Sequence, residues 1–176
     1  MRQIVGSIEG EYRRYKALAD GAIAQVTDGQ LLLTGGPGSN SVATLVWHIS
    51  GNLVSRFTEF LTTDGEKPWR DRDAEFLARN VDRTELLQKW EHAWAVLFQS
   101  LAGLDDEQLH AAVTIRGVNH SVHEALHRSL AHTAYHAGQI VFLAKALREG
   151  TWRYLSIPPG ESAAYNAKPI REKPPL

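Results

Sequence analysis

The sequence predicts an all-α protein, a four-helix bundle with a long crossover connection and an irregular C-terminal tail. In four stretches apolar residues recur at three- and four-residue steps, which is the period of an amphipathic helix. Almost no stretch alternates apolar and polar residues as a half-buried strand does. The connection after the second stretch is long and polar, which favours a crossover. At 176 residues the chain fits one domain, 1–176, with a core of its own.

The first two helices are separated by a glycine-rich loop. Apolar spacing predicts the first helix over about residues 4–26. The loop that follows contains Gly35-Gly36-Pro37-Gly38, but it lacks the Lys-Ser/Thr pair of a phosphate-binding loop, so we interpret it as a helix connection. Ser39, Asn40 or Ser41 can cap the second helix, whose apolar stripe runs from Val42 to Phe60.

The third and fourth helices carry capping signals. Asp82 and Glu85 can form a capping box before a stripe of Leu and Trp residues, and Ser121 and Glu124 can form one at the start of the last helix. That helix is expected to run to about residue 149, and residues 113–117 are expected to be extended. We expect the tail, 151–176, to dock on the body and its part 152–162 to wall a pocket.

The polar segment 64–79 allows two interpretations. Its alternating charges are typical of a solvated loop, which is the first interpretation, but they could also form a rim over a pocket.

Composition excludes several classes of function. The formal net charge is −1 with both signs interleaved, so we expect no nucleic-acid partner and no binding to a membrane surface. There is no cysteine, and therefore no disulfide, thiolate metal site or cysteine nucleophile. No apolar run approaches the ~20 residues that cross a bilayer. We therefore expect a cytoplasmic protein.

Three histidines are candidate metal ligands. His132 and His136 are four residues apart and lie on nearly the same side of the last helix, on a stripe of small or apolar residues. Buried imidazoles need partners, and a metal ion supplies a partner to both. His48 lies on the inner flank of the second helix and can be the third ligand. Three protein nitrogens with one open position are typical of a catalytic zinc-type site.

Other polar residues near these histidines are candidates for supporting or catalytic roles. Asn52, Tyr135 and Gln139 could hydrogen-bond the ligands or orient a substrate. Glu59 or a tail residue could close the site as a fourth ligand, which would make the ion structural. Three packed core histidines without a metal are the remaining alternative.

A competing motif lies earlier in the last helix. His123-Glu124-Ala125-Leu126-His127 fits H-E-x-x-H, the zinc-binding pattern of metallopeptidases. Glu124 is already explained by the capping box, and the longer form of the motif needs Gly and His where this chain has Leu130 and Thr133. A peptidase is therefore the less favoured interpretation.

Two segments resemble the DinB/YfiT-like superfamily of small bacterial four-helix proteins. They are Trp47-His48-Ile49-Ser50-Gly51-Asn52 and His132-Thr133-Ala134-Tyr135-His136-Ala137-Gly138-Gln139-Ile140. Within that superfamily Asp64-Gly65-Glu66, Trp69–Phe76 and Ser156–Ser162 look like an uncharacterised branch. The resemblance covers nearly the whole chain. It implies a histidine triad that holds one divalent metal, usually zinc or nickel, and here the triad falls on His48, His132 and His136.

The resemblance also implies classes of function. Some members are thiol S-transferases that use a low-molecular-weight thiol, one is a maleylpyruvate isomerase, and dimers are frequent. We therefore expect a metal-dependent transferase or hydrolase acting on a small molecule, and a homodimer. The alternative is a non-enzymatic dimeric metal-binding or stress-related module.

Overall fold

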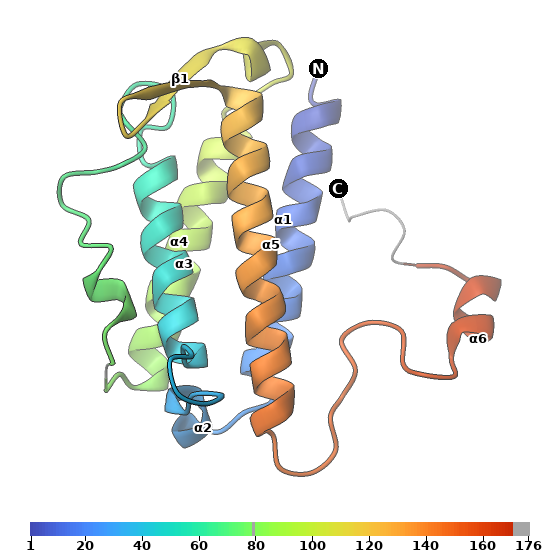
Figure 1. The fold of residues 1–176 in the computed structure, drawn as a ribbon. Helices are drawn as coiled ribbons and strands as arrows, with labels where there is room; N and C mark the ends of the chain where they lie inside the picture. The colour runs from blue at the N-terminus through green and yellow to red at the C-terminus, as the bar shows by residue number, and fades with distance from the viewer. Residues whose placement is uncertain (79, 171–176) are drawn as a thin grey trace.

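The computed structural model describes residues 1–78 and 80–170. Within these ranges four long helices lie side by side (Figure 1): α1 (Gln3–Ile23), α3 (Val42–Phe57), α4 (Arg83–Ala102) and α5 (Val122–Leu147). The shorter elements are α2 (Asp28–Leu32), η1 (Ala74–Phe76), η2 (Glu107–His110), β1 (Ala112–Ile115), β2 (Val118–Ser121) and α6 (Ser162–Ala167). The strands β1 and β2 form one antiparallel pair. The predicted all-α fold with a C-terminal tail is confirmed.

The order of the long helices explains the long connection. In Figure 1, α3 and α4 run in the same direction, whereas α1 and α5 run in the opposite one. Helix α1 packs mainly on α5, and α3 packs on both α4 and α5. Because α3 and α4 are parallel neighbours, residues 58–82 must return along the full length of the helices. This return carries η1 against the side of α3, which brings a polar segment to the helix that bears His48.

Helix ends follow local hydrogen bonding. The capping box of Ser121 and Glu124 is confirmed, with both halves formed. At α4 the Asp82 side chain accepts from the Glu85 N–H at 2.8 Å, which is half of the expected box. Helix α2 was not expected; it forms because Thr27 and Gln30 make a capping box of their own.

The second long helix is shorter than expected. Helix α3 ends at Phe57, not at Phe60, because Thr58 is extended and Glu59 adopts a φ of 50°.

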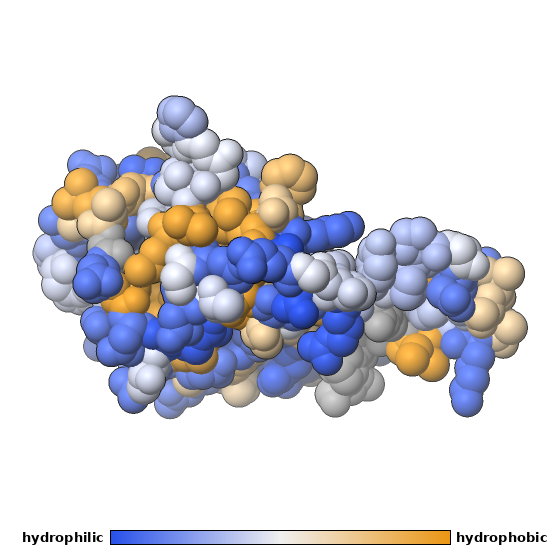
Figure 2. Space-filling model, turned by 90° about the horizontal axis from the view of Figure 1, so that it is seen from below, coloured by the Kyte–Doolittle hydropathy of each residue, from blue (hydrophilic) through white to orange (hydrophobic). Residues whose placement is uncertain are grey.

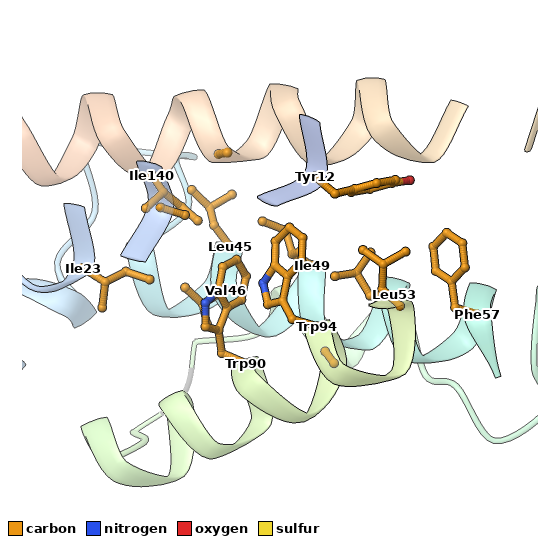
Figure 3. Packing of buried hydrophobic residues seen from close by; sticks show 14 of the residues in the cluster. Tyr12, Ile23, Leu45, Val46, Ile49, Leu53, Phe57, Trp90, Trp94 and Ile140 are labelled. Atoms are coloured by element: carbon orange, nitrogen blue, oxygen red, sulfur yellow. The ribbon is translucent and has the colours of Figure 1, made fainter. Parts of the chain in front are cut away.

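Aromatic side chains from α1 and α4 fill the core (Figure 3). Trp90 and Trp94 of α4 point at the apolar stripe of α3, and the Tyr12 ring of α1 lies edge-on to Trp94 at 6.3 Å. The Tyr12 hydroxyl donates to the carbonyl of Leu126 at 3.3 Å, and the Trp90 N–H donates to Asp20 at 2.7 Å. These bonds satisfy buried polar atoms and join α1 to its neighbours. The core fixes the relative placement of α3 and α5, the helices that carry the three candidate histidines.

The tail docks only at its beginning. Trp152 and Leu155 pack against the core, and Gln25 exchanges hydrogen bonds with the backbone of Arg153 at 3.1 and 2.8 Å. Beyond them the tail projects from the helical body as a separate lobe (Figures 1 and 2), and α6 has no buried residue. Of the expected docking tail, residues 171–176 lie outside the described residues. None of the helices in the described ranges has the length and apolar character that crossing a membrane requires.

Candidate metal centre

The three predicted histidines meet between α3 and α5. His48 projects from α3, and His132 and His136 project from successive turns of α5; their ligand atoms all lie within 4.8 Å of one another. The Nε2 atoms of His48 and His132 are 3.1 Å apart. Nitrogens bound at 2.0–2.1 Å to a tetrahedral ion lie about 3.3 Å apart. The donor set and its spacing therefore fit a divalent metal, and among the described residues no fourth His, Asp or Glu joins the group.

Glu75, from η1, fixes the orientation of His48. Glu75 is 5% exposed, and its carboxylate accepts from the Nδ1 of His48 at 2.8 Å. On its other side it accepts two hydrogen bonds from Arg70, each 2.8 Å long. Burial alone would raise the pKa of Glu75, but the bonds from Arg70 and His48 outweigh it and hold this pKa below its ordinary value. With the Nδ1–H donating to Glu75, the Nε2 lone pair of His48 is left to face the other two histidines.

Gly51 makes the approach of Glu75 possible. A Cβ built at this position would lie 2.1 Å from Oε1 of Glu75 and 2.8 Å from its Cδ. Any side chain here would therefore push the carboxylate away from His48. A glycine inside a helix costs about 1 kcal/mol relative to alanine, so its presence one turn after His48 is explained by this contact.

The two histidines of α5 are neutral near pH 7. Gln139 accepts a hydrogen bond from the Nδ1 of His136 at 2.8 Å, which leaves the Nε2 of His136 free to ligate. Burial, aided by the neighbouring imidazoles, lowers the pKa of His132 to about 3. Burial also lowers the pKa of His136, and the bond to Gln139 offsets this only in part. Neutral imidazole is the form that binds a metal.

A cavity of about 250 Å³ opens beside His48 and His132. Its wall comes from α3, the 58–82 connection, β1 with its turn, and α5. Asn52 of α3, buried, lies in this wall one turn from His48. The remaining polar lining is dominated by arginine. The arrangement is a set of three potential ligands next to a small, positively charged chamber.

Comparison with known proteins places the chain in a family. The model of the family described as "Protein of unknown function (DUF1572)" matches residues 2–161. The chain belongs to the DUF1572 family. The crystal structure of a conserved protein from Enterococcus faecalis has a similar fold, with a TM-score of 0.61 and 18% sequence identity over 84% of this chain and 98% of that chain. At that identity the similarity shows the fold alone. No curated protein matches the chain.

Of the other predicted site residues of this DUF1572 protein, some lie at the triad or in the cavity wall and others do not. Gln139 contacts a histidine of the triad and Asn52 lines the cavity, as described above. Tyr135 is 63% exposed and does not line the cavity; its ring meets the edge of the His136 ring, with centroids 4.9 Å apart. Glu59 lies beyond the end of α3 in the wall of a different pocket. Glu59 is therefore not a fourth ligand. No residue of the described tail lines the cavity beside the triad, so the prediction that 152–162 walls this cavity is wrong.

The H-E-x-x-H motif lies on the surface of the DUF1572 fold. His123 and His127 are exposed, with ring centroids 4.2 Å apart, and neither belongs to the three-histidine group. Glu124 accepts from both the N–H and the hydroxyl of Ser121. Its carboxylate is used in helix capping, so this geometry does not favour a peptidase.

Sequence reasoning missed the two residues that the connection brings to the triad. Glu75 and Arg70 come from segment 64–79, for which the first interpretation was a solvated loop. That interpretation is wrong for the part around them: Glu75 and Lys67 are buried, and the Arg70 side chain is 2% exposed. The alternative, a rim over a pocket, agrees with the structure. The available signal was Gly51, an unfavourable residue inside an otherwise regular helix and next to a candidate ligand. Residue 79 lies outside the described residues.

Proposed function

We propose that this protein is a DinB-like, divalent-metal-dependent enzyme that acts on a small molecule as a thiol S-transferase or a hydrolase. The observation that supports the proposal is the convergence of three imidazoles beside a cavity, with no fourth protein ligand among the described residues. A catalytic zinc-type site needs three protein ligands and one open position. A closed structural site needs four.

Each residue around the triad has a role in this proposal. His48, His132 and His136 hold one ion, zinc or nickel. When bound, the ion lowers the pKa of a water or thiol so that its anion exists near neutral pH. Glu75 and Gln139 hold two of the imidazoles with their Nε2 atoms facing inward. Asn52 offers the cavity a carboxamide that can both donate to and accept from a substrate.

Metal content tests the site. Untagged wild-type protein, reconstituted with zinc or nickel and desalted, is expected to retain about one equivalent by mass spectrometry. His132→Ala should lose it, whereas His127→Ala, which removes an exposed histidine of the same helix, should retain it. Loss in His127→Ala with retention in His132→Ala would support the peptidase motif. No metal in the wild type after reconstitution would contradict the proposal.

A second measurement separates an enzyme from a non-enzymatic metal-binding module. The visible spectrum of cobalt-substituted protein should change when a small thiol such as cysteine is added, because an open position accepts a new ligand. A spectrum that does not respond would indicate a closed site and favour the non-enzymatic alternative.

A homodimer is the remaining part of the proposal. Tyr135 and Phe142 are 63% and 77% exposed on one side of α5, with the exposed Gly138 between them in sequence. Exposed aromatic side chains on a helix are common at protein–protein contacts. Light scattering of the wild type against Phe142→Glu should show a dimer that the substitution weakens; a monomeric wild type would contradict this part.

A further inference from the structure

The cavity beside the triad is lined by five arginines and by no acidic residue. They are Arg56, Arg70, Arg72, Arg116 and Arg128. This concentration is notable in a chain whose formal net charge is −1. The lining also includes His48 and His132, so the positive wall and the candidate ligands share one chamber.

The nearby carboxylates do not balance these charges. A single oxygen of Glu66 serves three of the arginines, at 3.0 Å from Arg56, 3.0 Å from Arg116 and 4.0 Å from Arg70. Glu75 pairs with Arg70, and the exposed Asp73 lies 3.6 Å from Arg72. Asp64 also lies nearby, where it accepts from the backbone N–H groups of Arg116 and Gly117 at 2.8 Å. Four carboxylates therefore face five guanidinium groups.

Two of these guanidinium groups have unused donors. Arg70 gives its Nε and Nη2 to Glu75, but its Nη1 is buried and has no hydrogen-bond partner within the described ranges. A buried N–H without an acceptor is unfavourable and rare in native proteins. Arg128 makes no ion pair with any described residue, and it lies one turn before His132 on α5. A fully buried donor and an unpaired cation thus line the same small volume.

We propose that this cavity binds the anionic part of a small-molecule substrate, a carboxylate or a phosphate group, with Arg70 and Arg128 as the recognising residues. Guanidinium N–H groups match the geometry of both oxyanions. The volume of about 250 Å³ suits a small molecule rather than a polymer. The inference rests on the proposed function only in placing the anion beside a metal; the arginines would bind the anion in metal-free protein as well.

Anion binding tests the proposal separately from the metal. Inorganic phosphate and succinate are titrated calorimetrically, at constant ionic strength, into metal-free and zinc-loaded wild type, Arg128→Gln and Arg153→Gln. Arg153 is an exposed arginine of the tail outside the cavity, so its substitution is a control of equal charge change. We expect saturable binding by the wild type in both metal states, about tenfold or more weaker in Arg128→Gln and unchanged in Arg153→Gln.

The outcomes are distinguishable. Binding of phosphate alone assigns a phosphate-bearing substrate, and binding of succinate alone assigns a carboxylate. Anion binding by a protein that fails to retain metal would uphold this inference while the proposed function fails. The inference would be overturned, even if the metal site is present, if the wild type bound neither anion in both metal states. It would also be overturned if Arg128→Gln and Arg153→Gln changed anion affinity equally.

Discussion

Substitution of Gly51 by alanine has two opposing effects on stability, and the size of each can be estimated. In a helix interior this change alone stabilises by about 1 kcal/mol. Here the new Cβ would fall 2.1 Å from Oε1 of Glu75, and the carboxylate cannot simply swing away because His48 and Arg70 hold it in a buried position. Breaking such a buried charge pair costs about 3–5 kcal/mol. We therefore expect Gly51→Ala to destabilise the metal-free protein by about 2–4 kcal/mol.

Thermal unfolding in the presence of a chelator measures this effect. For a chain of this size 1 kcal/mol corresponds to about 2–4 °C in Tm, so the expected decrease is roughly 5–15 °C. The control is Gly6→Ala in α1, where an added Cβ meets nothing within 4 Å and a small gain in stability is expected. If Gly51→Ala gains stability as Gly6→Ala does, and binds metal like the wild type, Gly51 does not set the position of Glu75 and the reasoning is refuted.

Three further predictions follow from other contacts. Glu75→Gln should weaken zinc affinity about 10- to 100-fold in a competition titration, because the amide keeps the shape but loses the charge that orients His48; equal affinities would show that the charge is unnecessary. Asp106 accepts from the N–H groups of residues 3–5, which hold its pKa below the ordinary value, so its stabilisation of the folded state is present at neutral pH and lost as pH falls through the lowered pKa. Asp106→Asn should therefore lower Tm at pH 7 and match the wild type at strongly acidic pH; a constant difference would exclude a role for the charge. Deletion of 157–176 should change the free energy of unfolding by less than about 0.5 kcal/mol, because α6 has no buried residue, whereas a cooperative loss in urea unfolding would show that the tail supports the body.

Local sequence signals were sufficient for the long helices and their caps. The apolar stripe of α4 and the box of Ser121 and Glu124 depend on residues three and four apart, and both are present in the structure. They were insufficient for β2, because a four-residue strand leaves too few positions to show a period. Helix α2, with five residues, also shows no period, and its one local signal, the capping box of Thr27 and Gln30, was missed. The β1 segment was expected to be extended, but its pairing with β2 could not be predicted from 113–117 alone.

The candidate site divides in the same way. His132 and His136 are joined by helical spacing, and His48 could be added because it occupies an inner flank of another helix. Glu75 reaches His48 from 27 residues away, through a connection with no periodic pattern. The packing of η1 on α3 determines that contact. Gly51 indicated that something approaches α3 at this point, but it did not indicate which residue. Tyr135 lies near the triad as its spacing indicated, with its ring against that of His136, but it is 63% exposed, and its candidate role stays a prediction.

The guanidinium of Arg70 takes part both in the support of the histidine triad and in the wall of the cavity. Two of its nitrogens hold Glu75, which holds His48, and its third nitrogen is free to meet an anion in the cavity. An anion bound there and an ion bound at the triad would therefore share one side chain. Thermodynamic reciprocity then requires that any factor by which the metal changes anion affinity equals the factor by which the anion changes metal affinity. Binding of the substrate and retention of the metal in the cell would accordingly be coupled. A shortage of one would change the affinity with which the protein holds the other.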